Sequence, residues 1–109
     1  MMKLQNLKVE TLSDLREHGK TAEDVRWVGT RGRKIPLDVF WKEADRNYDS
    51  GFGGPEVNEC LMVVGDDWWL ERHEYDGSEW WEYKEHPSQP LVMETEDPLH
   101  LIFAESFFW

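Results

Sequence analysis

The residues best suited to chemistry are carboxylates that alternate with tryptophans along one stretch. Glu71, Glu79 and Glu82 lie close to two Trp-Trp pairs. Two carboxyl groups beside aromatic rings are typical of glycoside hydrolases, in which one serves as the acid and the other as the base or nucleophile. That reaction needs a cleft and a defined carboxyl separation, and acids on one short hairpin predict neither. We therefore expect a solvated acidic face and no catalytic residue.

A second group of oxygen ligands partly matches a calcium-binding loop. Asp45, Asn47, Asp49 and Glu56 have the spacing of positions 1, 3, 5 and 12 of that loop. The match fails at position 6, where Ser50 stands in place of the glycine that the turn requires. We expect a Gly-rich loop and no metal site, and the sequence leaves open whether the loop binds a cation.

The cysteine and the histidines predict no further active site. Cys60 is the single cysteine and begins the apolar run Cys60–Val64, so we expect it to be buried and inert. A single cysteine cannot form a disulfide within the chain, which fits a reducing compartment. The histidines, which lack metal-ligand spacing, are His18, His73, His86 and His100. No phosphate loop or dinucleotide fingerprint is present, so no cofactor is expected.

Two tryptophan pairs, Trp68-Trp69 and Trp80-Trp81, mark the predicted binding surface. Adjacent residues of a strand face opposite ways, so each pair places one indole on each face of the sheet. We expect one indole of each pair to pack under the helices and the other to be exposed or half covered. Exposed indoles flanked by acids can bind a protein, a sugar or a cation. The predicted partner-binding residues are Trp68, Trp69, Glu71, Arg72, His73, Glu79, Trp80, Trp81 and Glu82.

The dipeptide Asp76-Gly77 between two alternating aromatic runs predicts a β-hairpin. A two-residue loop would set Glu71 opposite Glu82, and opposed like charges are destabilising. We therefore predict a three-residue loop that begins at Tyr75, with Gly77 in a bulge. One face would then carry Trp69, Glu71, His73, Glu79, Trp81 and Tyr83, and the other Trp68, Leu70, Arg72, Trp80, Glu82 and Lys84.

Hydrophobic periodicity predicts two helices and several further strands. Thr11–His18 reads as a helix that ends at Gly19. Leu37–Asn47 is the clearest helix, and its apolar stripe consists of Leu37, Phe40, Trp41, Ala44 and Tyr48. Thr21–Asp24 reads as one helical turn. The expected strands are Val25–Val28 with a small hairpin after it, Cys60–Val64 as the buried central strand, the two arms of the hairpin, and Leu91–Met93 and Leu99–Phe103 beyond the linker His86–Pro90.

Length and charge limit the classes of protein that remain. The 109 residues predict one domain, 1–109, with a formal net charge of −11. Residues 1–46 hold ten Lys or Arg against eight Asp or Glu, whereas residues 47–109 hold two against fifteen, a net charge of −13. An acidic half repels phosphates and anionic lipids, so we expect neither direct nucleic-acid binding nor membrane binding. With no signal peptide or spanning stretch visible, we expect a cytoplasmic location.

These patterns together predict an α+β fold: an antiparallel β-meander of about five strands with one or two helices packed on one face. The run Val64–Pro87, which contains WWLERHEYDGSEWWE, resembles a segment of small phage and prophage proteins of Gram-positive bacteria whose activity is unknown. The helix and loop Asp38–Gly53 resemble the same proteins more weakly. The resemblance implies an accessory protein of a mobile element that acts inside a bacterial cell, and it transfers no functional residue.

The leading functional hypothesis is a non-enzymatic, acidic protein-binding module. It would dock a basic surface, for example that of a host protein that handles nucleic acid. The alternative is a small carbohydrate- or cation-binding domain that uses the same Trp-rich hairpin. The apolar carboxyl-terminal residues Phe107, Phe108 and Trp109 either fold back onto the core of a monomer or join two chains in a homodimer.

Overall fold

The computed structural model describes residues 3–90, so the predicted strands Leu91–Met93 and Leu99–Phe103 and the segment Phe107–Trp109 lie outside the described residues. Residues 3–90 form two α-helices, one 3₁₀ turn and seven strands. In chain order these elements are β1 (Leu4–Asn6), α1 (Leu7–Glu17), η1 (Ala22–Asp24), β2 (Trp27–Thr30), β3 (Arg33–Ile35), α2 (Leu37–Ala44), β4 (Asn47–Asp49), β5 (Met62–Val64), β6 (Trp68–Tyr75) and β7 (Ser78–Glu85).

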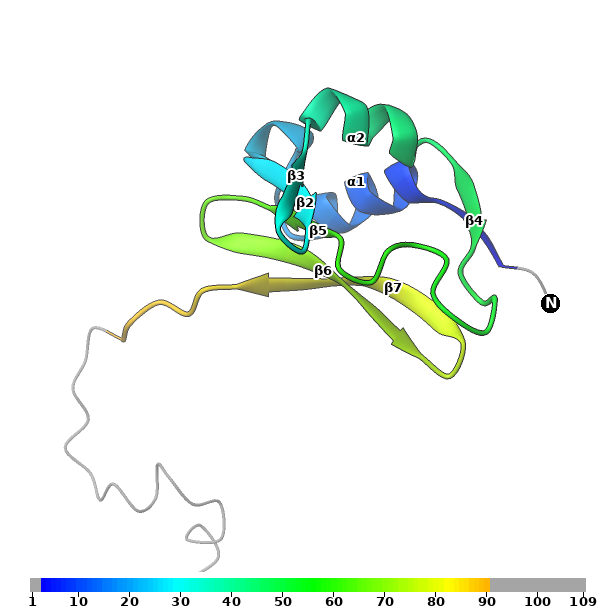
Figure 1. The fold of residues 1–109 in the computed structure, drawn as a ribbon. Coiled ribbons are helices and arrows are strands. Elements are labelled where there is room, and N and C mark those ends of the chain that lie inside the picture. Colours follow the sequence, from blue (N-terminus) through cyan, green and yellow to red (C-terminus); the bar gives the residue numbers. More distant parts are fainter. Residues whose placement is uncertain (1–2, 91–109) are drawn as a thin grey trace, which may run out of the picture.

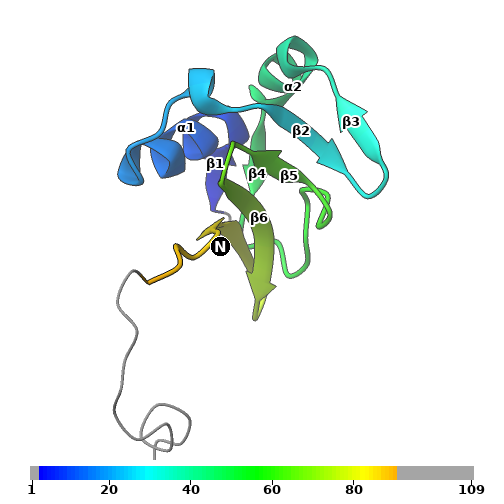
Figure 2. The same cartoon turned by 90° about the vertical axis from the view of Figure 1, so that its left-hand side faces the viewer.

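Five of these strands form an antiparallel sheet in the order β3-β2-β5-β6-β7, and β1 pairs with β4 in a separate ribbon. The chain leaves the sheet after β3, passes through α2 and β4, and re-enters beside β2 as β5. Both helices lie on the same side of the large sheet (Figures 1 and 2). The predicted α+β class, with an antiparallel sheet and helices on one face, is confirmed.

Helix α1 begins four residues before the predicted Thr11, because Asn6 caps it. The Asn6 side-chain oxygen accepts the N–H of Val9 at 3.1 Å, which satisfies one of the amide groups that a helix start leaves unpaired. Thr11 is fully buried inside the helix instead, beside the equally buried Leu15. The inward face of α1 therefore contains a hydroxyl as well as an apolar side chain.

Helix α2 is shorter than predicted and ends at Ala44 rather than Asn47. Phe40 and Ala44 are buried, so this part of the predicted stripe is confirmed. Tyr48, predicted as its last member, lies in β4 and pairs with Gln5 of β1. The helix stops because this pairing, with a segment some forty residues away in the chain, takes the residues that would have extended it.

The hairpin of β6 and β7 has a two-residue loop, so the predicted three-residue loop is wrong. Asp76 and Gly77 both have positive φ angles, 50° and 86°, as a type I′ turn requires. Tyr75 pairs with Ser78, and the next rungs follow without a bulge. Glu71 consequently lies opposite Glu82, the arrangement that the charges argued against. The contacts that offset this repulsion come from side chains described below.

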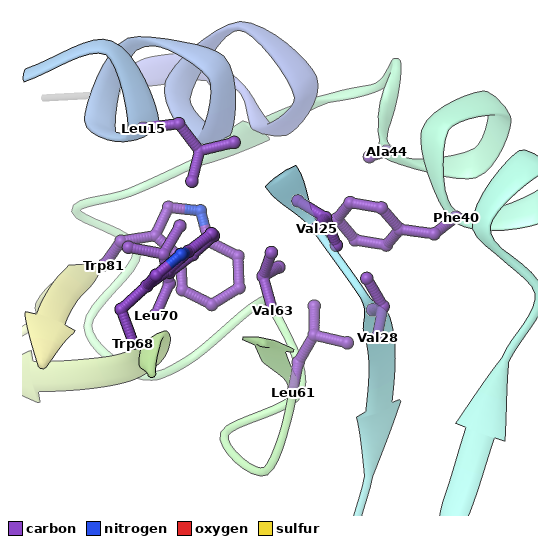
Figure 3. Packing of buried hydrophobic residues seen from close by; sticks show 10 residues of the cluster. All are labelled: Leu15, Val25, Val28, Phe40, Ala44, Leu61, Val63, Trp68, Leu70 and Trp81. Atoms are coloured by element: carbon purple, nitrogen blue, oxygen red, sulfur yellow. The ribbon is translucent and has the colours of Figure 1, made fainter. Parts of the chain in front are cut away.

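The core fills the space between the helices and the sheet (Figure 3). Its buried members are Leu15, Val25, Val28, Phe40, Ala44, Leu61, Val63, Trp68, Leu70 and Trp81. Gly65 permits the position of Trp68, because a Cβ atom at residue 65 would lie 2.1 Å from the indole. Central strand β5 contains the fully buried Val63, as expected, but Cys60 precedes the strand and is half exposed rather than buried.

We expect Leu70→Ala to lower the free energy of unfolding by about 3 kcal/mol, because Leu70 is fully buried in β6 and its loss leaves a cavity. Urea denaturation measures the effect. The matched control is Val9→Ala on the surface of α1, where the side chain is 64% exposed and the change should stay within about 0.5 kcal/mol. Equal losses in both variants would contradict this assignment of the core.

Candidate functional site

The register of the hairpin gives its two faces different surroundings. The inner face, toward the helices, carries Trp68, Leu70, Arg72, Glu79, Trp81 and Tyr83. The outer face carries Trp69, Glu71, His73, Trp80, Glu82 and Lys84. The predicted faces are therefore wrong for β7, because a one-residue shift of register moves every side chain to the other side. One indole of each Trp pair is buried and the other half covered, as predicted.

A buried ionic cluster centred on Arg72 attaches the hairpin to the rest of the molecule. The Nη2 atom of Arg72 donates to Glu79 Oε1 at 2.8 Å and to the Tyr48 hydroxyl at 3.1 Å, and Nη1 donates to Glu10 Oε2 at 3.3 Å. The guanidinium also lies over the ring of Trp81, 4.8 Å from its centre. The side chains of Arg72 and Glu79 are each only 2% exposed. The cluster thus joins α1, β4, β6 and β7.

Most polar atoms of the cluster have hydrogen-bond partners. Glu79 also accepts the backbone N–H groups of Glu56 and Val57. Burial would lower the pKa of Arg72, but its bonds to Tyr48 and Glu79 outweigh burial and raise the pKa, so Arg72 stays a cation. Among the described residues, Arg72 Nε is left without a hydrogen-bond partner, a cost of about 1–3 kcal/mol.

Four predicted partner-binding residues are part of this interior. Trp68, Arg72, Glu79 and Trp81 are all buried on the inner face. The Trp81 indole N–H donates to the hydroxyl of Thr11 in α1 at 2.9 Å. These four residues have structural roles in the packing, and the surface on which a partner could dock is left to the other five.

The outer face continues from the hairpin across two more strands. Strand pairing aligns Trp27 of β2 with Val64 of β5, and Val64 with Trp69 of β6. In the adjacent row, Met62 of β5 lies beside Glu71 of β6. These apolar side chains are half buried, and because their neighbours Val28, Val63 and Leu70 are buried toward the core, alternation places them on the opposite side of the sheet. The face therefore combines a strip of apolar side chains with carboxylates.

Sequence reasoning did not include Trp27, Met62 and Val64 in the site, although a signal for them existed. Val28 and Val63 face inward, so alternation along each strand places their neighbours outward. That inference requires knowing that β2 and β5 pair with each other, which a single sequence does not reveal.

Each outward indole of the hairpin donates to a carboxylate two residues further along its own strand. Trp69 Nε1 donates to Glu71 Oε1 at 2.7 Å, and Trp80 Nε1 donates to Glu82 Oε2 at 3.0 Å. These hydrogen bonds are the largest cause that lowers the pKa of both carboxyl groups. The two indole–carboxylate pairs are thus held ionised and in fixed orientations.

Two basic side chains on the same face contact the opposed acids. His73 Nε2 lies 2.6 Å from the second oxygen of Glu71, and Lys84 Nζ lies 3.6 Å from Glu82 Oε1. Neighbours on the same strand therefore stabilise both carboxylates, and the pairing of Glu71 with Glu82 becomes tolerable. The repulsion predicted from the sequence is present, but local hydrogen bonds outweigh it.

The acids do not form the arrangement of a glycoside hydrolase. Glu79 faces inward, whereas Glu71 and Glu82 face outward. The cavity beside Glu79 and His73 has a volume of about 40 Å³, enough for a few water molecules but not for a sugar ring.

The calcium-like loop uses its oxygen atoms for internal hydrogen bonds. The side-chain amide of Asn6 donates to Asp45 at 2.9 Å and to Asn47 at 3.3 Å. Glu56 accepts the backbone N–H of Asp49 at 3.1 Å. Across residues 3–90, no three His, Cys, Asp or Glu side chains lie close enough together to hold a metal ion.

The chain matches no protein-family model, no curated protein and no solved structure. In the part of the chain that the structure describes, no helix has the length and apolar character needed to cross a membrane.

We expect Arg72→Met to lower the free energy of unfolding by about 3–5 kcal/mol, because Glu79 and Glu10 would be left buried without their cation. The control is Arg26→Met. Arg26 also contacts a carboxylate, Asp66 at 2.9 Å, but both side chains are largely exposed and the loss should stay below about 1 kcal/mol. Denaturant unfolding separates the two cases, and a loss for Arg72→Met as small as the control's would refute the structural role of the cluster.

Asp14 is an ionisable group that the fold disfavours as an anion. Burial raises its pKa to about 6, and repulsion from Glu10 and Glu17 adds to the shift, while His18 and Arg72 act in the opposite direction. The folded state therefore holds this proton to higher pH than the unfolded state does. The resulting penalty is absent below pH 4, grows between pH 4 and pH 6 and is complete above that range.

We expect Asp14→Asn to stabilise the protein above pH 6, by about 1 kcal/mol, since partial exposure of the carboxyl screens the shift. Near pH 4 the variant and the wild type should have equal stability. Thermal unfolding at pH 7.5 and at pH 4 measures the difference. Glu23→Gln, on an exposed residue, serves as the control, and a gain for Asp14→Asn that does not depend on pH would contradict this explanation.

Proposed function

We propose that this protein is a non-enzymatic binding module that docks a basic protein surface on the outer face of its sheet. The observation that carries the proposal is the pair of outward indole–carboxylate contacts, Trp69–Glu71 and Trp80–Glu82. Each pair presents a partly exposed aromatic ring beside a carboxylate that is already ionised and oriented. Lysine and arginine side chains can contact both groups at once, through an ion pair and through the ring face.

Preorganisation favours binding through this face. A free glutamate loses rotamer entropy when it forms an ion pair, but Glu71 and Glu82 are already held by an indole N–H. The charge of the sequence helps as well, since residues 47–109 carry a net charge of −13. A field of that sign speeds the encounter with a cationic partner, while the indoles supply apolar area that slows its dissociation.

The phage-like hairpin sequence supports a biological setting for this proposal. An acidic accessory protein of a mobile element would find suitable basic surfaces on host proteins that handle nucleic acid. It would inhibit such a protein by occupying its phosphate-binding groove. Its own acidic surface repels phosphates, so the contact would be with the protein and not with nucleic acid. This setting requires a cytoplasmic location in the bacterial host cell.

The proposal is tested with a lysine- and arginine-rich peptide as a defined probe. We expect Glu71→Gln combined with Glu82→Gln to weaken binding about tenfold, or about 1.4 kcal/mol. Glutamine keeps an oxygen for each indole N–H, so only the charge is lost. Binding to the wild type should also weaken between 50 mM and 300 mM salt, because screening shortens the range of charge attraction. Calorimetric titration measures both effects.

The control removes the same charge from the helix side, with Glu23→Gln and Glu43→Gln together. That variant should bind within about twofold of the wild type, a difference of under 0.5 kcal/mol. Equal weakening in both double variants, or affinity that does not depend on salt, would refute docking on the outer face. A change in tryptophan fluorescence with sugars or with Ca²⁺, without a response to the peptide, would favour a carbohydrate- or cation-binding domain.

A further inference from the structure

In the sheet formed by residues 3–90, strand β7 lies at the edge and is eight residues long. An edge strand of this length presents a row of backbone donors and acceptors to which another strand can pair. Natural proteins commonly blunt such edges by shortening or covering them. Whether another strand can pair with β7 therefore depends on which of its outward backbone groups already have a partner.

Near the start of β7, one outward backbone group already has a partner within the protein. The N–H of Glu79 donates to the carbonyl of Ser50 at 2.9 Å, from the loop that follows β4. This bond shows which backbone groups of β7 point away from β6. Because the direction alternates along a strand, the same groups of Trp81, Tyr83 and Glu85 also point outward. Within residues 3–90 these three residues have no backbone partner on that side.

An added strand would meet acidic groups on both faces of the sheet. On the outer side it would lie beside Trp80 and Glu82, the second indole–carboxylate pair. On the inner side, α1 runs along β7, since the ring of His18 stacks on Tyr83 with the ring centres 3.9 Å apart. That helix carries two acids near its carboxyl-terminal end, Asp14 and Glu17, that do not belong to the Arg72 cluster. Basic side chains would therefore be favoured on either face of the incoming strand.

We infer that the free edge of β7 takes an extended, lysine- or arginine-rich segment of a partner protein as a sixth strand. This inference rests on the proposed function and specifies the form of its partner. Backbone pairing with Trp81, Tyr83 and Glu85 supplies the register, and contacts with Trp80 and Glu82 supply the preference for cations. The outer face and the edge then form one continuous binding surface.

Hydrogen exchange of the full chain tests whether the edge is open. We expect the amides of Trp80, Glu82 and Lys84, which bond to β6, to exchange at least about tenfold more slowly than those of Trp81, Tyr83 and Glu85. Slow exchange at all six amides in the protein alone would mean that the chain's own remaining residues or a second copy already occupy the edge. That result would overturn the inference.

A peptide of alternating lysine and threonine then tests strand addition. We expect it to slow exchange at the amides of Trp81, Tyr83 and Glu85 by about tenfold or more at saturation, whereas an analogue N-methylated at alternate residues should bind at least about tenfold more weakly. The analogue has the same charge but cannot complete the ladder.

Two outcomes distinguish failure of the inference from failure of the proposed function. If both peptides bind equally, depend on Glu71 and Glu82, and leave the three edge amides unprotected, the outer face binds cations and strand addition is wrong. If neither peptide binds at low salt, the proposed function and the inference both fail.

Discussion

The arrangement of the hairpin depends on the buried hydrogen bonds that the guanidinium of Arg72 makes. The guanidinium is buried with Glu79 of its own hairpin, and it also reaches Glu10 of α1 and Tyr48 of β4. Such a cluster is costly to bury and contributes little net stability compared with apolar packing, but it tolerates few alternative geometries. Slippage of β7 by one residue would turn Glu79 outward and leave Arg72 without its closest anion. The cluster therefore selects the register, and the register determines which indoles reach the surface.

Much of the local structure could be predicted from short-range patterns. Asp76-Gly77 indicates the hairpin turn, and alternation indicates that only one indole of each Trp pair is buried. The apolar stripe of α2 is readable in the same way from Phe40 and Ala44. These features depend on neighbours in the sequence, so a single chain contains the information needed to find them.

The register and the composition of the site could not be predicted, because the deciding contacts are distant in sequence. Opposed carboxylates at Glu71 and Glu82 argue for another register until their own partners are known. Burial of Arg72 depends on Glu10, which lies sixty-two residues away in the chain. In the same way, Trp27 joins the outer face only because β2 pairs with β5. Each error reflects a non-local contact that overrides a correct local preference.

The two indole–carboxylate pairs also make the outer face poor in unused hydrogen-bond donors. The N–H groups of Trp69 and Trp80, the ring nitrogen of His73 and the ammonium of Lys84 are all directed at carboxylates of the same face. What the hairpin mainly offers a ligand is carboxylate lone pairs and flat ring surface. A molecule rich in acceptors, such as a phosphate ester or an acidic peptide, would find few free donors on the hairpin and would compete with the bonds already made there. The hydrogen bonds within the unbound outer face thus already disfavour ligands of this kind.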